Sequence, residues 1–246
     1  MSHEEQRSSD GGVEKIPSQS SSGTESNADP HWPLQHEPHQ FADAGAVGLS
    51  GFCFTAFVAG LFFARAKSVA IPNAVVGLAT FYGGMIEMLC GIWEMAKANT
   101  YMATLHTSYG ALWISFAAIF IPTFGVAQAY ADEPEQFRNA LGFFFLAWGL
   151  LSFMFFLLSW KTTYPLLATS FLLMVSMFCL TGGYMREKHS ASTLKAAGIL
   201  LIITACCGWY VVYSAVSNRQ NTYLSAYPIH LPDFTRAKKN KSEPKA

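Results

Sequence analysis

Six long apolar stretches, separated by short polar links, constrain the folding of this 246-residue chain more than any other feature. A helix that crosses the hydrocarbon core of a bilayer needs about 20 apolar residues, and each stretch is close to that length. The sequence therefore predicts an all-α, polytopic membrane protein with six transmembrane helices. The expected spans are residues 46–64, 74–96, 103–121, 141–160, 165–182 and 194–216.

Charged residues gather at the two ends of the chain. Only 13% of all residues are charged, against about 25% in an average soluble domain. Residues 1–45 hold eight acidic and two basic side chains, and residues 217–246 hold six basic and two acidic ones. We expect residues 1–42 to be a disordered tail, because they contain few large apolar side chains. Residues 43–216 then form the membrane domain, and residues 217–246 a second tail.

An even number of spans places both tails on one side of the membrane. Ten Lys and Arg residues lie on that side and six on the other. This excess predicts cytoplasmic tails, although much of it lies in the distal C-terminal tail, where the rule is weaker. The chain does not begin with a charged region followed by an apolar one, so we expect the first span to direct insertion instead of a cleaved signal peptide.

Several functional classes are disfavoured by the sequence. The motifs G-x-S-x-G, H-E-x-x-H and Walker A do not occur, so we do not expect an enzyme. The formal net charge is zero, which provides no global basic field to attract nucleic acid. The cysteines lack zinc-type spacing, and His31, His36 and His39 are irregularly spaced between prolines. We therefore expect neither a metal nor a cofactor.

Polar and ionisable side chains interrupt the second and third apolar stretches at Glu87, Glu94, His106 and Tyr109. An ionisable group in lipid costs several kcal/mol unless it faces protein or water. Glu94 lies near the end of its span, close to Lys97. That position favours an interfacial ion pair with Lys97 or a cap on a neighbouring helix.

Glu87 lies near the middle of its span, and two interpretations remain open. It either forms a structural hydrogen bond to an adjacent helix or lies beside a transport route. In an apolar setting, desolvation disfavours the charged form of a carboxyl group, so Glu87 could carry a proton. His106 is either an interfacial residue or a pH-sensitive group at a pore mouth. Glu87 and His106 are therefore the candidate proton-carrying or pH-sensing residues.

Several motifs follow one another along the apolar region and the start of the second tail. They are FYGG at 81–84, GIWE at 91–94, NT at 99–100, TSYGALW at 107–113 and NRQNTYL at 218–224. Together they resemble the acetate uptake transporter family, also called the succinate–acetate permease family. The resemblance covers residues 43 to 232, and the segments ISFAAIFIP at 114–122 and NALGFFFLAWGL at 139–150 are similar to fungal members in particular.

The resemblance implies a plasma-membrane protein in which six-helix protomers form a homohexamer, each with its own central path. It implies transport of acetate or a similar short-chain monocarboxylate, by proton symport or through a channel. The hydrophobic constriction of the family falls on Phe52, Tyr109 and Leu173. An apolar ring resists a bare carboxylate, because dehydration of the charge is costly, whereas the neutral acid passes more easily.

The chain departs from the family where the substrate entrance is expected. The family signature Asn-Pro-Ala-Pro-Leu-Gly-Leu is here replaced by Asp43, Ala44, Gly45, Ala46, Val47, Gly48 and Leu49. Similarly, a family Gln becomes Glu87, and a family Phe or Leu becomes His106. Two alternative functions therefore stay open: a non-transporting acid sensor or regulator that signals through its tails, and an ammonium exporter.

Overall fold

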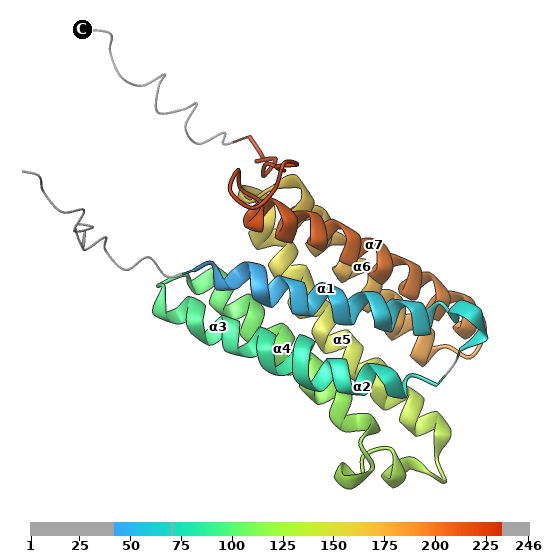
Figure 1. Ribbon diagram of the computed structural model, residues 1–246. Helices are drawn as coiled ribbons and strands as arrows, with labels where there is room; N and C mark the ends of the chain where they lie inside the picture. Colours follow the sequence, from blue (N-terminus) through green and yellow to red (C-terminus); the bar gives the residue numbers. More distant parts are fainter. Residues whose placement is uncertain (1–41, 70, 233–246) are drawn as a thin grey trace, which may run out of the picture. The chain divides into compact units, whose positions relative to one another are not determined.

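The computed structural model describes residues 42–69 and 71–232, and this part of the chain is built almost entirely from helices. Its α-helices are α1 (Ala44–Phe63), α2 (Asn73–Thr80), α3 (Glu87–Ala96), α4 (Thr100–Phe120), α5 (Pro134–Leu158), α6 (Tyr164–Met185) and α7 (Ser190–Val216). A π-helical segment, Phe81–Ile86, joins α2 to α3 (Figure 1). The expectations for residues 1–41 and for the basic end of the C-terminal tail lie outside the described residues.

All six predicted spans lie on helices, and the all-α, multi-pass prediction is confirmed. The boundaries differ most on α5, which begins at Pro134 instead of residue 141. Within the described residues, the helical stretches long and apolar enough to cross a membrane are Ala44–Phe63, Asn73–Ala96, Pro134–Lys161, Tyr164–Met185 and Ser190–Val216. Helix α4 has a similar length, 21 residues, but its Thr, Ser, Tyr and His side chains make it less apolar.

Hydroxyl groups within the spans are satisfied by the helices that carry them. Ser152, Thr169 and Thr204 each donate a hydrogen bond of 2.8 Å to the backbone carbonyl four residues earlier. Lipid offers no hydrogen-bonding partner, so a polar group in a span must find its partner within the protein. These residues therefore occur in apolar helices without breaking them.

The ends of the helices follow local sequence signals. Asp43, Asn99 and Thr163 cap α1, α4 and α6, and each accepts a hydrogen bond from a backbone amide two or three residues later, at 3.1, 3.3 and 3.4 Å. Such caps satisfy amides that have no partner within the helix. Helix α4 ends directly before Ile121, whose extended backbone suits a residue followed by proline.

Helices α1, α6 and α7 pack closely together, as do α5 with α6 and α3 with α4. Glycine permits the closest approach, between α1 and α7. A Cβ atom on Gly198 would lie 2.6 Å from the carbonyl oxygen of Gly60 and would also meet the backbone of Ala64. Small residues at such crossings are typical of membrane helices.

Helix α4 is separated from α5 and α6 by large side chains, and its backbone packs mainly against α2, α3 and the π-helical segment. Aromatic rings bridge the space in a continuous series, with centroids 5.5 to 6.3 Å apart. The order of the rings is Tyr101, Phe155, Tyr109, Phe52, Trp113, Phe116, Phe145 and Tyr184. The interior of the bundle is therefore aromatic along its length.

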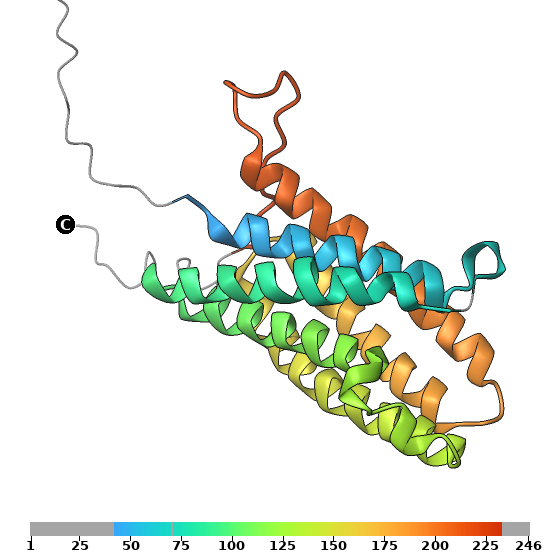
Figure 2. The ribbon, with the colours of Figure 1, turned by 60° about the horizontal axis from the view of Figure 1, so that its bottom comes forward.

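The first half of the predicted C-terminal tail is held against the bundle. The segment forms a loop beyond the end of α7 (Figure 2). The amide of Tyr164 donates to the carbonyl of Ile229 at 2.8 Å, and the amide of Leu231 donates to the carbonyl of Thr162 at 3.2 Å. In addition, the Asn221 side chain donates to the carbonyl of Val216, the last residue of α7, at 2.8 Å. Residues 217–232 thus belong structurally to the membrane domain.

We predict that Gly198→Ala destabilises the protein. The new methyl group meets backbone atoms of α1, which cannot rotate away, so the free energy of unfolding should fall by about 1–3 kcal/mol. The matched control is Gly182→Ala on α6, where no atom lies within 4 Å of the added Cβ. Thermal unfolding of the purified protein in detergent measures both variants, and equal stability of the two contradicts the prediction.

Candidate functional site

The three residues predicted to form a constriction lie together in the interior of the bundle. Phe52 on α1, Tyr109 on α4 and Leu173 on α6 are each 3% exposed. The rings of Phe52 and Tyr109 have centroids 5.5 Å apart. All three line one cavity of about 20 Å³, together with Leu49, Leu105, Leu166, Thr169 and Ser170.

Two more cavities lie further along the same helices. The second has a volume of about 10 Å³ and the third about 300 Å³. Their lining residues follow those of the first cavity in the same order along α4 and α6. On α4 the three cavities use residues 105–109, 112–116 and 116–120, and on α6 they use residues 166–173, 177–180 and 184. The cavities therefore form an interrupted row through the bundle, with the narrow parts at its aromatic and leucine side chains.

A hydrogen bond fixes the position of Tyr109 in this row. Its hydroxyl donates to Ser152 Oγ on α5 at 3.1 Å, and Ser152 in turn donates to a carbonyl of its own helix. The ring also contacts Phe155, one turn further along α5, at a centroid distance of 5.6 Å. Tyr109 is thus held from α1 and α5 at once.

The predicted entrance stretch, Asp43 to Leu49, forms the first turns of α1. Gly45, Ala46, Gly48 and Leu49 are buried, whereas Val47 is half-exposed. Of the seven residues, Leu49 lines the first cavity. The two prolines of the family signature are absent here, and the stretch continues directly into the helix.

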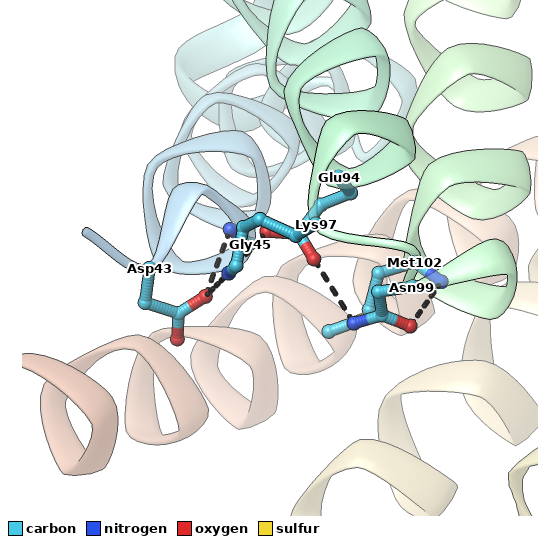
Figure 3. Close-up of polar contacts among 6 residues, drawn as sticks. All are labelled: Asp43, Gly45, Glu94, Lys97, Asn99 and Met102. Carbon is cyan, nitrogen blue, oxygen red and sulfur yellow. Dashed lines mark hydrogen bonds and ion pairs between the residues drawn. The ribbon is translucent and has the colours of Figure 1, made fainter. Parts of the chain in front are cut away.

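A charged cluster ties the start of α1 to the link between α3 and α4 (Figure 3). Lys97 Nζ lies 2.8 Å from Glu94 Oε1 and 3.5 Å from Asp43 Oδ1. The side-chain amide of Asn99 donates to Glu94 Oε2 at 2.9 Å. The hydrogen bond to Glu94 raises the pKa of Lys97. The predicted Glu94–Lys97 ion pair is confirmed, and the same lysine also partly neutralises Asp43.

Glu87 and His106 form a buried pair between α3 and α4. Glu87 Oε1 lies 3.3 Å from His106 Nδ1, and both side chains are 0% exposed. The interfacial interpretation of His106 is therefore wrong, because the ring is enclosed between helices. The interpretation of Glu87 as a hydrogen-bonding partner of an adjacent helix is confirmed. Gly48 packs against this pair, since a Cβ atom there would lie 2.8 Å from His106 Nδ1.

The pair has unused hydrogen-bonding capacity. Glu87 Oε2 and His106 Nε2 are buried and have no hydrogen-bond partner among the described residues. Neither residue lines the three cavities. His106 and Tyr109 lie three residues apart on α4, but His106 contacts α3 and Tyr109 contacts α5. The sequence periodicity placed them on one helix face and could not separate these two directions.

Other residues of the row were missed in the sequence. Ser152, Thr169 and Ser170 are isolated hydroxyls in apolar segments, and Thr169 and Ser170 lie four and three residues before Leu173. That helical spacing could have placed them beside the constriction. Arg65 and Arg138, which line the third cavity, are charges at the ends of spans and gave no signal distinguishable from a solvated link.

The fold and the interior row of cavities define a multi-pass helical membrane protein with an interrupted path through its bundle. Residues 25–233 match the model of the GPR1/FUN34/yaaH family, and the chain belongs to this family. The family resemblance inferred from the motifs is therefore confirmed.

Individual relatives carry different names. The chain is 41% identical over 194 residues to Ammonia transport outward protein 2 of Saccharomyces cerevisiae, covering 79% of this chain and 68% of that protein. It is 29% identical over 217 residues to Acetate permease A of Emericella nidulans, covering 84% and 73%. The structure of the bacterial acetate channel SatP matches with a TM-score of 0.67 and 27% sequence identity, covering 77% of this chain and 99% of that chain.

Proposed function

We propose that this protein carries acetate or a similar short-chain monocarboxylate across the plasma membrane along its interior row of cavities. The observation that carries the proposal is the convergence of Phe52, Tyr109 and Leu173 on one narrow cavity in a member of the GPR1/FUN34/yaaH family. Relatives named as an acetate permease and an acetate channel support it. We further propose a homohexamer with both tails in the cytoplasm, and the function requires no chemical step.

The lining of the first cavity favours the protonated acid over its anion. The hydroxyls of Thr169 and Ser170 already donate to backbone carbonyls at 2.8 and 3.0 Å. Tyr109 likewise donates to Ser152. Their oxygens can therefore accept a hydrogen bond from a passing molecule, which a carboxylic acid can donate and a carboxylate cannot. The apolar remainder of the lining adds the dehydration cost of a charge.

Uptake of labelled acetate by proteoliposomes tests the function. A carboxyl group with the reference pKa of about 4.3 becomes roughly 80 times more protonated between pH 7 and pH 5. After subtraction of the protein-free vesicles, we expect uptake to rise at least tenfold over that range. Uptake that does not exceed the protein-free background at any pH rejects the proposal.

Shortening Leu173 should widen the range of acids carried. In Leu173→Ala the narrow cavity gains the volume of three carbon atoms. We therefore expect the rate of lactate or butyrate uptake, relative to acetate, to rise at least fivefold. The matched control is Leu172→Ala on the same helix, which lines none of the three cavities and should keep the ratio within twofold. The same ratio in both variants argues against Leu173 as a constriction residue.

We assign the Glu87–His106 pair as the group that couples transport to protons. A hydrogen bond between Nδ1 and Oε1 needs a proton on one of the two atoms, so the pair can gain or lose one. Glu87→Gln should remove the part of the pH dependence of uptake that exceeds the change in neutral acid, while the protein still folds. Glu94→Gln, the control, alters a carboxylate that pairs with Lys97 and should keep the wild-type profile. Identical profiles for Glu87→Gln and wild type exclude the pair from proton coupling.

A second candidate function is the export of ammonium or ammonia. A relative 41% identical to this chain is named as an outward ammonia transporter, and a lining that accepts hydrogen bonds also suits N–H donors. Labelled methylammonium in the same vesicles separates the candidates. Its flux rises with pH if the neutral amine passes, opposite to the dependence expected for acetic acid.

A further inference from the structure

The third cavity, with a volume of about 300 Å³, is far larger than the other two. It lies at the end of the bundle where α1 ends and α5 and α7 begin, opposite the Asp43 cluster. Its lining is mainly aromatic and includes Phe62, Phe116, Phe120, Phe137 and Tyr184. A volume of this size is at the lower end of the range for pockets that enclose an organic ligand.

The charges on this cavity are of one sign. Arg65 and Arg138 belong to its lining, and no acidic residue does. The Arg65 side chain is exposed and has no acidic partner within ion-pairing distance among residues 42–69 and 71–232. Arg138 Nη2 lies 3.1 Å from Glu187 Oε1, but Glu187 is 78% exposed and leaves the other guanidinium donors available. Guanidinium groups suit a carboxylate because they present paired donors in one plane.

We propose that this cavity binds an amphiphilic monocarboxylate, with its carboxylate at Arg65 and Arg138 and an aromatic or medium-chain body among the phenylalanine rings. Acetate would leave most of the cavity unfilled. A dicarboxylate would place its second charge against apolar rings, at a high desolvation cost. The single anionic group and the apolar body are therefore both needed for the match.

The volumes of the neighbouring cavities give this ligand a second property. A body that fills about 300 Å³ cannot enter cavities of about 10 and 20 Å³. The ligand binds at the end of the path and does not pass, so it blocks the flux of smaller acids. The blocking effect rests on the proposed function, whereas the binding does not.

Direct binding of labelled 4-phenylbutyrate to the full-length chain in phosphatidylcholine nanodiscs tests the site, with empty nanodiscs as the blank. We expect saturable binding that weakens at least fivefold in Arg65→Gln and in Arg138→Gln. Arg186→Gln is the matched control, because Arg186 is exposed near the same end and lines none of this cavity; its affinity should stay within twofold. The neutral amide 4-phenylbutyramide should compete at least fivefold less well than the acid.

Three results overturn the proposal: binding no greater than in empty nanodiscs, affinities unaffected by both Arg65→Gln and Arg138→Gln, or equal competition by the amide and the acid. Ala191→Phe supplies a variant that removes no charge. Ala191 is exposed and lines the cavity, so the new ring should fill the space and weaken binding at least fivefold in a folded protein. Unchanged binding in Ala191→Phe also counts against the site.

Transport then separates this inference from the proposed function. In proteoliposomes, 4-phenylbutyrate should inhibit acetate uptake in the wild type at least fivefold more strongly than in Arg65→Gln, and it should not accumulate itself above the protein-free background. If the chain carries no acetate but binds 4-phenylbutyrate through the arginines, the proposed function fails and the site stands. If acetate is carried and 4-phenylbutyrate is not bound, the site fails alone.

Discussion

The contact between aromatic rings in the interior is the interaction on which the rest of this structure depends. Helix α4 packs its backbone against α2 and α3, and it meets α5 and α6 mainly through side chains. The rings of Phe52, Tyr109 and Phe155 bridge that gap from α1, α4 and α5. The same rings hold the two sides of the bundle together and narrow the path, so closure of the path and cohesion of the bundle are one property.

Much of the fold could be predicted from the sequence because lipid imposes a simple rule. A stretch of about 20 apolar residues must become a helix, since lipid cannot satisfy exposed backbone groups. The links were harder. The extension of α5 back to Pro134 and the docking of residues 217–232 depend on polar contacts with distant parts of the chain, which leave no periodic pattern in the sequence.

The site was predictable where it depends on types of residue and not where it depends on direction. The family motifs located Phe52, Tyr109 and Leu173, and the spacing of Glu94 and Lys97 indicated their ion pair. Helical periodicity could not show that His106 faces Glu87, because it does not reveal which neighbour each face meets. Ser152 was missed for the same reason: a lone hydroxyl in α5 acquires its role only from Tyr109, 43 residues away in the chain.

The π-helical segment Phe81–Ile86 has a consequence for how this chain can change in evolution. A π-turn accommodates one more residue than an α-turn, and one residue corresponds to about 100° of rotation. The segment therefore sets the angular phase of everything that follows it, including Glu87. Loss of a single residue here would relax the turn to α-helix and rotate that carboxylate away from His106. The FYGG motif should tolerate some exchanges of side chain, but its length is fixed.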